Sequence, residues 1–300
     1  MISVIVPSYN EEENISAACE AISSALENEP EYEIIFVDDG SRDETWNKIL
    51  SAADDPHVRG LRFSRNFGKE AAIRAGLEAS CGDAAVVIDC DLQHPPEVIP
   101  EMMKKWRDGA QVVEGKKSAR GREAKSYGFL ASIFNAMMSK ATGFDMTDAS
   151  DFMLLDRKAV EAVLSYGEKG SFFRSLAQFV GFETETVYYK VSARERGQGK
   201  WTFSKLFVYA LDNLAAFSSA PLYLGLLFGI LSVAAGAVLF VLKWCGVPLG
   251  SFSAGVLTLM VLCGLILGTL GIIGFYLSRI YDEIKRRPKY IISCDTKERT

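Results

Sequence analysis

The residues best suited to chemistry follow three short apolar runs. They are Tyr9-Asn10-Glu11, Asp38-Asp39-Gly40-Ser41 and Asp89-Cys90-Asp91-Leu92-Gln93. In an extended segment, side chains two positions apart point the same way, so Asp89, Asp91 and Gln93 are expected to aim oxygen atoms at one centre. Hard oxygen ligands suit Mg²⁺ or Mn²⁺, which also bind a diphosphate. The third cluster therefore predicts a metal site, although the same acids alternatively cap the helix expected to start near Pro96.

The two earlier clusters suit the binding of a nucleoside. Tyr9 offers a ring face, and Asp38 or Asp39 can accept hydrogen bonds from a base N–H or from ribose hydroxyls. A turn followed by a helix cap is the alternative interpretation of the second cluster. The first apolar run is not followed by GxGxxG, which disfavours dinucleotide binding, and the lack of GxxxxGK[ST] excludes a P-loop.

An alternation of strands and helices must position these clusters. Strands are expected at residues 3–6, 34–37, 58–63, 84–88 and 152–155, and helices at 11–26, 43–53 and 69–80. This order predicts an α/β domain in which helices cover a mostly parallel sheet. Ligands of such sheets bind outside the carboxyl ends of the strands, so one crevice is expected to gather all three clusters.

A long uncharged region follows the α/β part. Between Pro221 and Ser278 there is no acidic residue, and Lys243 is the only basic one. A membrane-spanning helix needs about 20 apolar residues, so the region predicts a hairpin with spans at about 221–243 and 252–278. A pair of buried core helices is the alternative. Basic residues flank the hairpin, and the positive-inside rule then places the large domain and both termini in the cytoplasm, with the hairpin in the inner or plasma membrane.

The resulting division of the sequence has four parts. Residues 1–200 form the α/β domain, 201–220 an amphipathic juxtamembrane helix, 221–278 the hairpin, and 279–300 a basic cytoplasmic tail. The amphipathic segment is expected either in the headgroup plane or against the α/β domain. Glycines at 264, 268, 271 and 274 suit close helix contacts and favour a homo-oligomer, for which a tetramer is one arrangement.

Composition excludes several classes of protein. The 300 residues are 49% hydrophobic and carry a net charge of −5, which argues against nucleic-acid binding. The six cysteines are scattered and form no CxxC pair, so zinc and redox sites have no support. His57 and His94 have no partner histidine nearby and are expected to be structural.

Four segments together resemble one family. They are Val6-Pro7-Ser8-Tyr9-Asn10-Glu11-Glu12, Val37-Asp38-Asp39-Gly40-Ser41, Arg65-Asn66-Phe67-Gly68-Lys69 and Asp89-Cys90-Asp91-Leu92-Gln93-His94-Pro95-Pro96-Glu97. The protein resembles glycosyltransferase family two, and within it the polyisoprenyl-phosphate glycosyltransferases, which include dolichol-phosphate mannose synthases and bactoprenol glucosyltransferases. The resemblance extends over essentially the whole sequence. It implies a GT-A fold, a nucleotide-sugar donor and an inverting transfer onto a lipid phosphate.

The resemblance also implies roles for individual residues. Asp89, Asp91 and Gln93 would bind the metal and the diphosphate. The donor site would include Pro7, Tyr9, Glu11, Asp38, Asp39, Lys69 and Asp89. Segment 194–201 resembles a family loop that closes over phosphates through Arg194 and Lys200, although Gly199 stands where Ser or Thr is usual.

Further residues are expected near the acceptor. Lys117, Arg120 and Arg122 lie in a basic stretch that suits phosphates, with a solvated loop as the alternative. Family members place an acidic residue near the acceptor in the region of Asp148 and Asp151. Asp151 is preferred because it directly precedes the apolar run 152–155. Together with Asp91, Arg194 and Lys200, these two acids complete the expected catalytic set.

Family analogy favours UDP-glucose as donor and undecaprenyl phosphate as acceptor. A lipid phosphate is already ionised, so its attack needs no general base. Transfer of mannose from GDP-mannose to a polyprenyl or dolichyl phosphate is the alternative. A processive polysaccharide synthase is disfavoured because Gln178-Phe179-Val180-Gly181-Phe182 lacks the Arg-Trp of a QxxRW motif, and because only two spans are expected.

Overall fold

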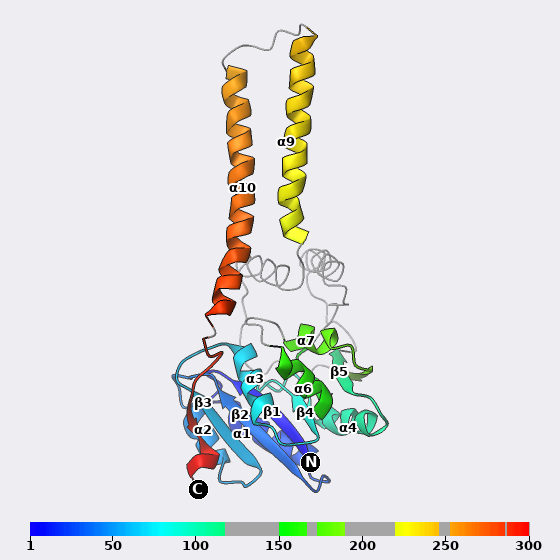
Figure 1. Cartoon of the computed structure of the whole chain (residues 1–300). Helices are drawn as coiled ribbons and strands as arrows, with labels where there is room; N and C mark the ends of the chain where they lie inside the picture. Colours follow the sequence, from blue (N-terminus) through cyan, green and yellow to red (C-terminus); the bar gives the residue numbers. More distant parts are fainter. Residues whose placement is uncertain (118–149, 167–172, 190–219, 246–252, 286, 300) are drawn as a thin grey trace. The chain divides into compact units, whose positions relative to one another are not determined.

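The structure is a computed structural model that describes residues 1–117, 150–166, 173–189, 220–245, 253–285 and 287–299. These residues fall into two compact units. The first contains the described residues up to 189 together with 288–299, and the second contains the two helices between 220 and 285. Figure 1 shows the elements of both units in colours that follow the sequence.

The strands of the first unit's described residues form one eight-stranded mixed sheet with the order β7-β5-β6-β4-β1-β2-β3-β8. Its strands are β1 (Ile2–Ser8), β2 (Tyr32–Asp38), β3 (Val58–Phe63), β4 (Ala84–Val87), β5 (Val112–Lys117), β6 (Met153–Asp156), β7 (Thr184–Tyr189) and β8 (Ile292–Asp295). The central strands β4, β1, β2 and β3 are parallel, as expected. β6 runs antiparallel to β4 and β5, and β8 antiparallel to β3, so the sheet is mixed outside its centre.

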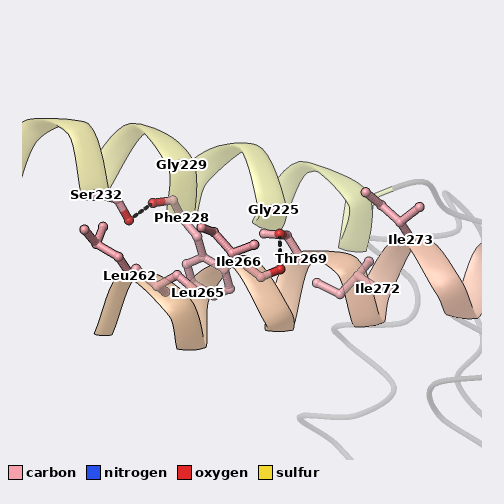
Figure 2. Close-up of a pocket in the computed structure, with 10 residues that line it drawn as sticks. All are labelled: Gly225, Phe228, Gly229, Ser232, Leu262, Leu265, Ile266, Thr269, Ile272 and Ile273. Atoms are coloured by element: carbon pink, nitrogen blue, oxygen red, sulfur yellow. Dashed lines mark hydrogen bonds between the residues drawn. The ribbon is translucent and has the colours of Figure 1, made fainter. Parts of the chain in front are cut away.

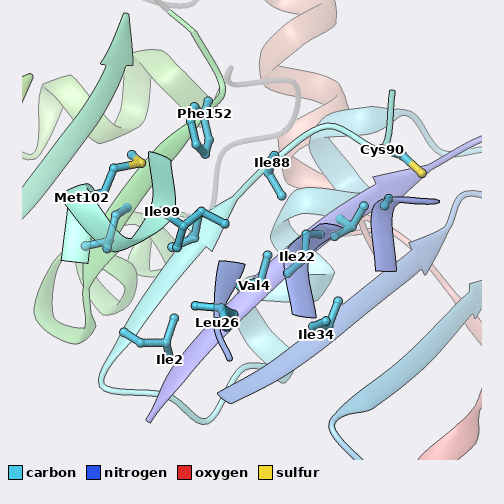
Figure 3. Close-up of a cluster of buried hydrophobic side chains, with 14 of the residues drawn as sticks. Ile2, Val4, Ile22, Leu26, Ile34, Ile88, Cys90, Ile99, Met102 and Phe152 are labelled. Carbon is cyan, nitrogen blue, oxygen red and sulfur yellow. The ribbon is translucent and has the colours of Figure 1, made fainter. Parts of the chain in front are cut away.

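Helices cover the sheet. They are α1 (Ile15–Ala25), α2 (Thr45–Ala52), α3 (Lys69–Ala79), α4 (Ile99–Arg107), α6 (Arg157–Ser165) and α7 (Phe173–Phe179), with short 3-10 helices η1 (Pro96–Val98) and η2 (Thr296–Arg299). Side chains alternate across β1. Val4 belongs to a buried cluster with residues of α1, α2 and α4 (Figure 3). Ile5 belongs to a second buried cluster with residues of α3, α6 and α7. Two apolar layers therefore enclose the sheet, which explains why all of β1 is buried.

The helices described in the second unit are α9 (Ala220–Trp244) and α10 (Ser253–Ile284). Both lie where apolar helices were expected, but α10 continues to Ile284, past the expected end at 278. Gly225 permits a close approach, because a Cβ atom there would lie 3.2 Å from the Thr269 methyl group. A groove of about 500 Å³ lies between α9 and α10 (Figure 2). The hydroxyls of Ser232 and Thr269, which line it, donate to carbonyls of their own helices. No helix within the described ranges combines the length and the sustained apolar character that a bilayer crossing requires.

The C-terminal residues differ from expectation. Instead of forming a tail with the residues after 278, the described residues from 288 onward rejoin the first unit, where β8 pairs with β3. Backbone N–H and C=O groups at a sheet edge need partners, and β8 supplies them along β3. The expected tail at 279–300 is therefore corrected for residues 288–299.

Candidate active site

The loops after β1 and β2 contact each other through several hydrogen bonds. The Asn10 amide donates to Ser41 Oγ over 2.9 Å, and the Arg42 amide donates to Asn10 Oδ1 over 3.0 Å. The Glu11 amide donates to Thr45 Oγ1, at the start of α2. The structure thus brings together the first two polar clusters, as the parallel topology predicts.

Asp38 and Asp39 are both buried, and each is held by the protein itself. Asp38 Oδ1 accepts from the Ser41 amide, while its Oδ2 lies 3.2 Å from Arg62 Nε. Asp39 accepts from the amides of Phe67 and Gly68 over 2.6 and 2.9 Å. Burial raises the pKa of Asp39, and those two amides oppose the rise. Asp39 therefore joins the end of β2 to the loop that precedes α3.

Two residues expected at the donor site, Pro7 in β1 and Tyr9 directly after it, differ in burial. Pro7 is buried inside the strand, opposite Val37 of β2. Tyr9 is 42% exposed, so its ring face is open to a ligand. Pro7 shapes the strand end, and Tyr9 is the residue of the two that can touch a nucleoside.

The acidic segment after β4 does not continue as a strand. Leu92 has a positive φ of 55°, and the backbone turns at residues 90–91. The Gln93 side-chain amide donates to Asp91 Oδ2 over 2.6 Å, and the Gln93 backbone amide approaches Asp91 Oδ1 at 3.2 Å. The expected extended geometry is wrong because the turn ends the alternation of side chains. Here Gln93 orients Asp91.

A charge network around the buried Asp151 links this segment to α3 and α7. Lys69 Nζ lies 2.6 Å from Asp89 Oδ1 and 2.7 Å from Asp151 Oδ2. Arg174 donates to both oxygens of Asp151 over 3.0 and 3.1 Å. Asp151 is only 7% exposed; although burial works against ionisation, Lys69 and Arg174 hold its pKa below the ordinary value. Asp151 is therefore an ionised partner of two cations and is poorly suited to accept a proton.

Two members of this neighbourhood were not anticipated from the sequence. Arg174 lies on α7, and Glu70 Oε2 accepts from the Phe173 amide at the start of that helix over 2.8 Å. Burial raises the pKa of Glu70 to about 7, with a further contribution from Asp151. The position of Glu70 beside Lys69 was a signal available in the sequence. Nothing near Arg174 in the sequence points to Asp151.

His94 is buried between an aromatic cluster and the acidic segment. Its Nδ1 lies 2.5 Å from the Tyr189 hydroxyl, and its ring stacks on Phe152. Its Nε2 lies 3.8 Å from Asp89 Oδ2. These contacts agree with a structural role for His94, which packs beside Asp89.

The fit of these carboxylates to a divalent cation depends on how many of them converge on one position. Three His, Cys, Asp or Glu side chains do not converge on one metal position within the described ranges. However, burial raises the pKa of Glu11, and the nearby charges of Asp91 and Asp89 raise it further. Mg²⁺ commonly uses one or two carboxylates together with substrate phosphates, so this concentration of oxygen ligands fits such an ion.

The side chains of several predicted site residues are not described by the structure. The backbone of Lys117 ends β5, and its side chain is not among those described. Arg120, Arg122, Asp148, Arg194 and Lys200 lie outside the described residues. The structure thus brings together residues of the donor and metal sets, and the roles expected of these six basic and acidic side chains stay predictions.

Comparisons with known proteins identify the family and the fold. The model of glycosyl transferase family 2 matches residues 3–164. The protein is 37% identical over 299 residues to a bactoprenol glucosyl transferase of Shigella phage SfII, and the match covers 97% of both proteins. It is 36% identical over 301 residues to the glycosyltransferase sll0501 of Synechocystis sp., covering 97% of this protein and 94% of that one.

A solved structure shares the fold. Glucosyl-3-phosphoglycerate synthase from Mycobacterium tuberculosis, in complex with Mn²⁺, UDP-glucose and phosphoglyceric acid, superposes with a TM-score of 0.53 at 21% identity. The match covers 72% of this protein and 77% of that one. At this identity the likeness shows the fold, an α/β mixed sheet of the GT-A type.

Proposed function

This chain belongs to glycosyl transferase family 2, and we propose that it transfers a hexose, with inversion, from a nucleotide sugar to a polyprenyl phosphate. The name of the phage relative supports a glucosyl group and a bactoprenol acceptor. UDP-glucose bound with Mn²⁺ in the structural neighbour supports the donor. We therefore propose UDP-glucose as donor and undecaprenyl phosphate as acceptor.

The observation that carries the proposal is the network around Lys69. Its ammonium group bridges Asp89, at the end of the central strand β4, and the buried Asp151. Together with Arg174, it places two cations beside carboxylates that suit a divalent cation. A diphosphate leaving group and a phosphate acceptor both need such charge, whereas a sugar hydroxyl acceptor would also need a base.

The chemistry assigned to the protein's own residues is positioning and charge neutralisation. Mg²⁺ or Mn²⁺, held by Asp89 and Asp91, would supply Lewis-acid neutralisation of the departing diphosphate. Gln93 orients Asp91, and Asp151 orients Lys69 toward the same place. Because both oxygens of Asp151 are bonded to cations, we assign Asp151 a positioning role. In the proposed reaction, the acceptor phosphate attacks the sugar without a protein base.

We propose that the second unit places this chemistry at a membrane. Large aliphatic side chains of α9 and α10 are more than half exposed, including Ile230, Leu231, Val238, Leu259, Leu267 and Leu270. The sequence around them has no acidic residue between Pro221 and Ser278. Exposed apolar surface of this extent suits lipid contact, so we propose that the helical pair anchors the protein to the inner membrane, with the catalytic unit in the cytoplasm.

We also propose a homo-oligomer formed through α10. A Cβ atom built on Gly264, Gly268 or Gly271 meets no heavy atom within 4 Å in the described part of the protein. These three glycines follow one another at helical spacing and leave a smooth face on which a second copy can pack. Crosslinking in membranes through cysteines placed beside these glycines tests this arrangement, and an exclusively monomeric product refutes it.

The proposed reaction is tested with membranes that contain the full-length protein, undecaprenyl phosphate and a panel of labelled nucleotide sugars. Labelled lipid is expected from UDP-glucose with Mg²⁺ or Mn²⁺ and is expected to vanish in EDTA. Asp91→Asn should lower transfer about a hundredfold or more, since charge stabilisation worth several kcal/mol is lost. Asp54→Asn, at an exposed turn after α2, is the matched control and should retain activity.

Each outcome of this assay decides one part of the proposal. Labelled lipid from GDP-mannose alone refutes the donor, and undiminished transfer in EDTA refutes the metal. A lack of labelled lipid with every donor, while the protein is folded and present in the membrane, refutes the polyprenyl phosphate acceptor.

A further inference from the structure

The C-terminal residues 288–295, which we call the C-terminal strap, cover the outer edge of β3. Leu61 pairs with Asp295, and Phe63 pairs with Ile292. The guanidinium of Arg59 is bidentate on Asp295, with distances of 3.1 and 2.6 Å. The strap is therefore fixed to β3 by backbone pairing and by a half-buried ion pair whose two residues are 236 positions apart in the sequence.

Tyr290 makes the strap's contact toward the donor site. Its ring stacks on Phe63 with centroids 5.0 Å apart and an interplanar angle of 14°. Its hydroxyl donates to Glu78 of α3. Phe63 in turn meets the edge of Phe67 at 5.7 Å. An aromatic contact path thus runs from the strap to the loop between β3 and α3.

That loop, residues 64–68, is the one bonded to Asp39. The amides of Phe67 and Gly68 hold the Asp39 carboxylate, and Lys69 follows directly with its bonds to Asp89 and Asp151. The strap also bonds the loop's first residue, because the Ser64 amide donates to the Ile291 carbonyl over 3.0 Å.

Burial of the loop's own side chains contributes little to its order. Residues 64–66 are exposed, and Phe67 is only half-buried. Gly68 has a φ of 100°, a conformation that the backbone leaves easily when its hydrogen bonds are lost. The loop's conformation therefore depends on its two anchors, Asp39 on one side and the strap on the other.

We infer that the C-terminal strap belongs to the donor site as a positioning element, with Tyr290 as its principal positioning residue. Tyr290 acts through Phe63 and Phe67 and touches no donor itself. When the loop leaves its bonded conformation, the fraction of protein competent to bind falls, and the apparent donor Kd rises in proportion. The segment that follows α10 thereby controls donor affinity. This inference rests on the proposed function for the identity of the donor.

The test compares three variants of the full-length protein in detergent. Tyr290→Ala removes the stack, Tyr290→Phe keeps the ring but removes the bond to Glu78, and Tyr32→Ala is the matched control. Tyr32 stacks on His57 at 4.5 Å and 14°, but at the amino end of β2, away from the strand ends that form the site. UDP binding with Mn²⁺ is measured by calorimetry, and donor KM and kcat are measured in the transfer assay.

Loss of one aromatic pair should raise the Kd for UDP about tenfold in Tyr290→Ala, and the donor KM with it. kcat should stay within about twofold, because the reacting groups are unchanged once donor is bound. Tyr290→Phe should change the Kd less than about threefold, and Tyr32→Ala should leave it unchanged. Equal UDP affinity in Tyr290→Ala and wild type overturns the inference, as does an equal loss in Tyr32→Ala.

Hydrogen exchange separates this inference from the proposed function. In ligand-free protein, the amides of Phe67 and Gly68 should exchange faster in Tyr290→Ala than in wild type or Tyr32→Ala. Unchanged exchange refutes the strap's role whatever the substrate is. Faster exchange in a protein that binds neither UDP nor GDP refutes the proposed donor and upholds the coupling of strap to loop. If Tyr290→Ala fails to fold, Tyr290→Leu keeps apolar volume without the stack and is subject to the same outcomes.

Discussion

Replacing Glu70 by glutamine is expected to stabilise the catalytic unit at alkaline pH and to leave it unchanged at acidic pH. Glu70 lies in the first turn of α3, where its Oε2 accepts from the Phe173 amide. Burial raises the pKa of this carboxyl from its ordinary 4.5 to about 7, and the negative charge of Asp151 contributes to the rise. Glutamine keeps an acceptor oxygen for the Phe173 amide but has no charge.

The sign follows from proton binding in the two states. The folded protein holds the Glu70 proton up to about pH 7, whereas the unfolded protein releases it near 4.5. Stability is therefore full below about pH 4.5 and declines as the pH rises toward 7. A shift of this size corresponds to about 3 kcal/mol at 1.36 kcal/mol per pKa unit. For a unit of this size, about 3 kcal/mol should appear as roughly 6–12 °C in Tm.

The assay is thermal unfolding of the full-length protein in detergent at about pH 5 and about pH 8, followed by the fluorescence of Trp46 and Trp106 in the first unit. Glu70→Gln should melt above wild type at the higher pH and close to it at the lower. Glu20→Gln, at an exposed position of α1, is the control and should follow wild type at both. An identical difference between variant and wild type at the two pH values refutes the titration, and a less stable variant at about pH 8 shows that the ionised carboxylate is stabilising.

Three further substitutions test the network and the strand ends. Asp151→Asn leaves two cations without their shared carboxylate and should cost about 2–4 kcal/mol of unfolding free energy, measured by denaturant titration, with a parallel loss of transfer. Gly40→Ala should cost more than about 1 kcal/mol and weaken UDP binding in calorimetry, because φ is 68° and the new Cβ would lie 2.5 Å from the Arg65 carbonyl carbon. Gly76→Ala should cost about 1–3 kcal/mol, because the new Cβ would clash with the Ile5 side chain. In an Ile5→Ala background the added cost of Gly76→Ala should be smaller, and strict additivity in the double-mutant cycle would contradict the assigned clash.

The sheet's centre was predictable from the sequence because its signals are local. The run Ile34 to Val37 is apolar throughout, as a strand buried on both faces must be. The three polar clusters were predictable as neighbours because they follow those strands, and parallel strands bring their carboxyl ends to one edge of the sheet. The hydrogen bond from the Asn10 amide to Ser41 Oγ confirms that convergence for the first two clusters.

The detailed geometry of the acidic segment was not predictable. An extended course from Asp89 to Gln93 was the simplest expectation, but Leu92 adopts the left-handed region that only context selects for such a residue. As a consequence, Gln93 bonds to Asp91 rather than presenting its oxygen beside that carboxylate. The contacts among these residues depended on one backbone angle, at Leu92.

Local sequence alone predicted the central strands, the helices between them, the family motifs and the uncharged helical pair, because periodicity and residue type operate within a few positions. Only the tertiary structure decided that Lys69 bridges Asp89 and Asp151 and that Arg174 also binds Asp151. It also decided that the last strand, β8, pairs with β3 at the edge of the sheet. The physical reason is separation along the sequence. Asp151 is 82 positions from Lys69, and Asp295 is 236 from Arg59, so only the folded sheet places these charges within bonding distance.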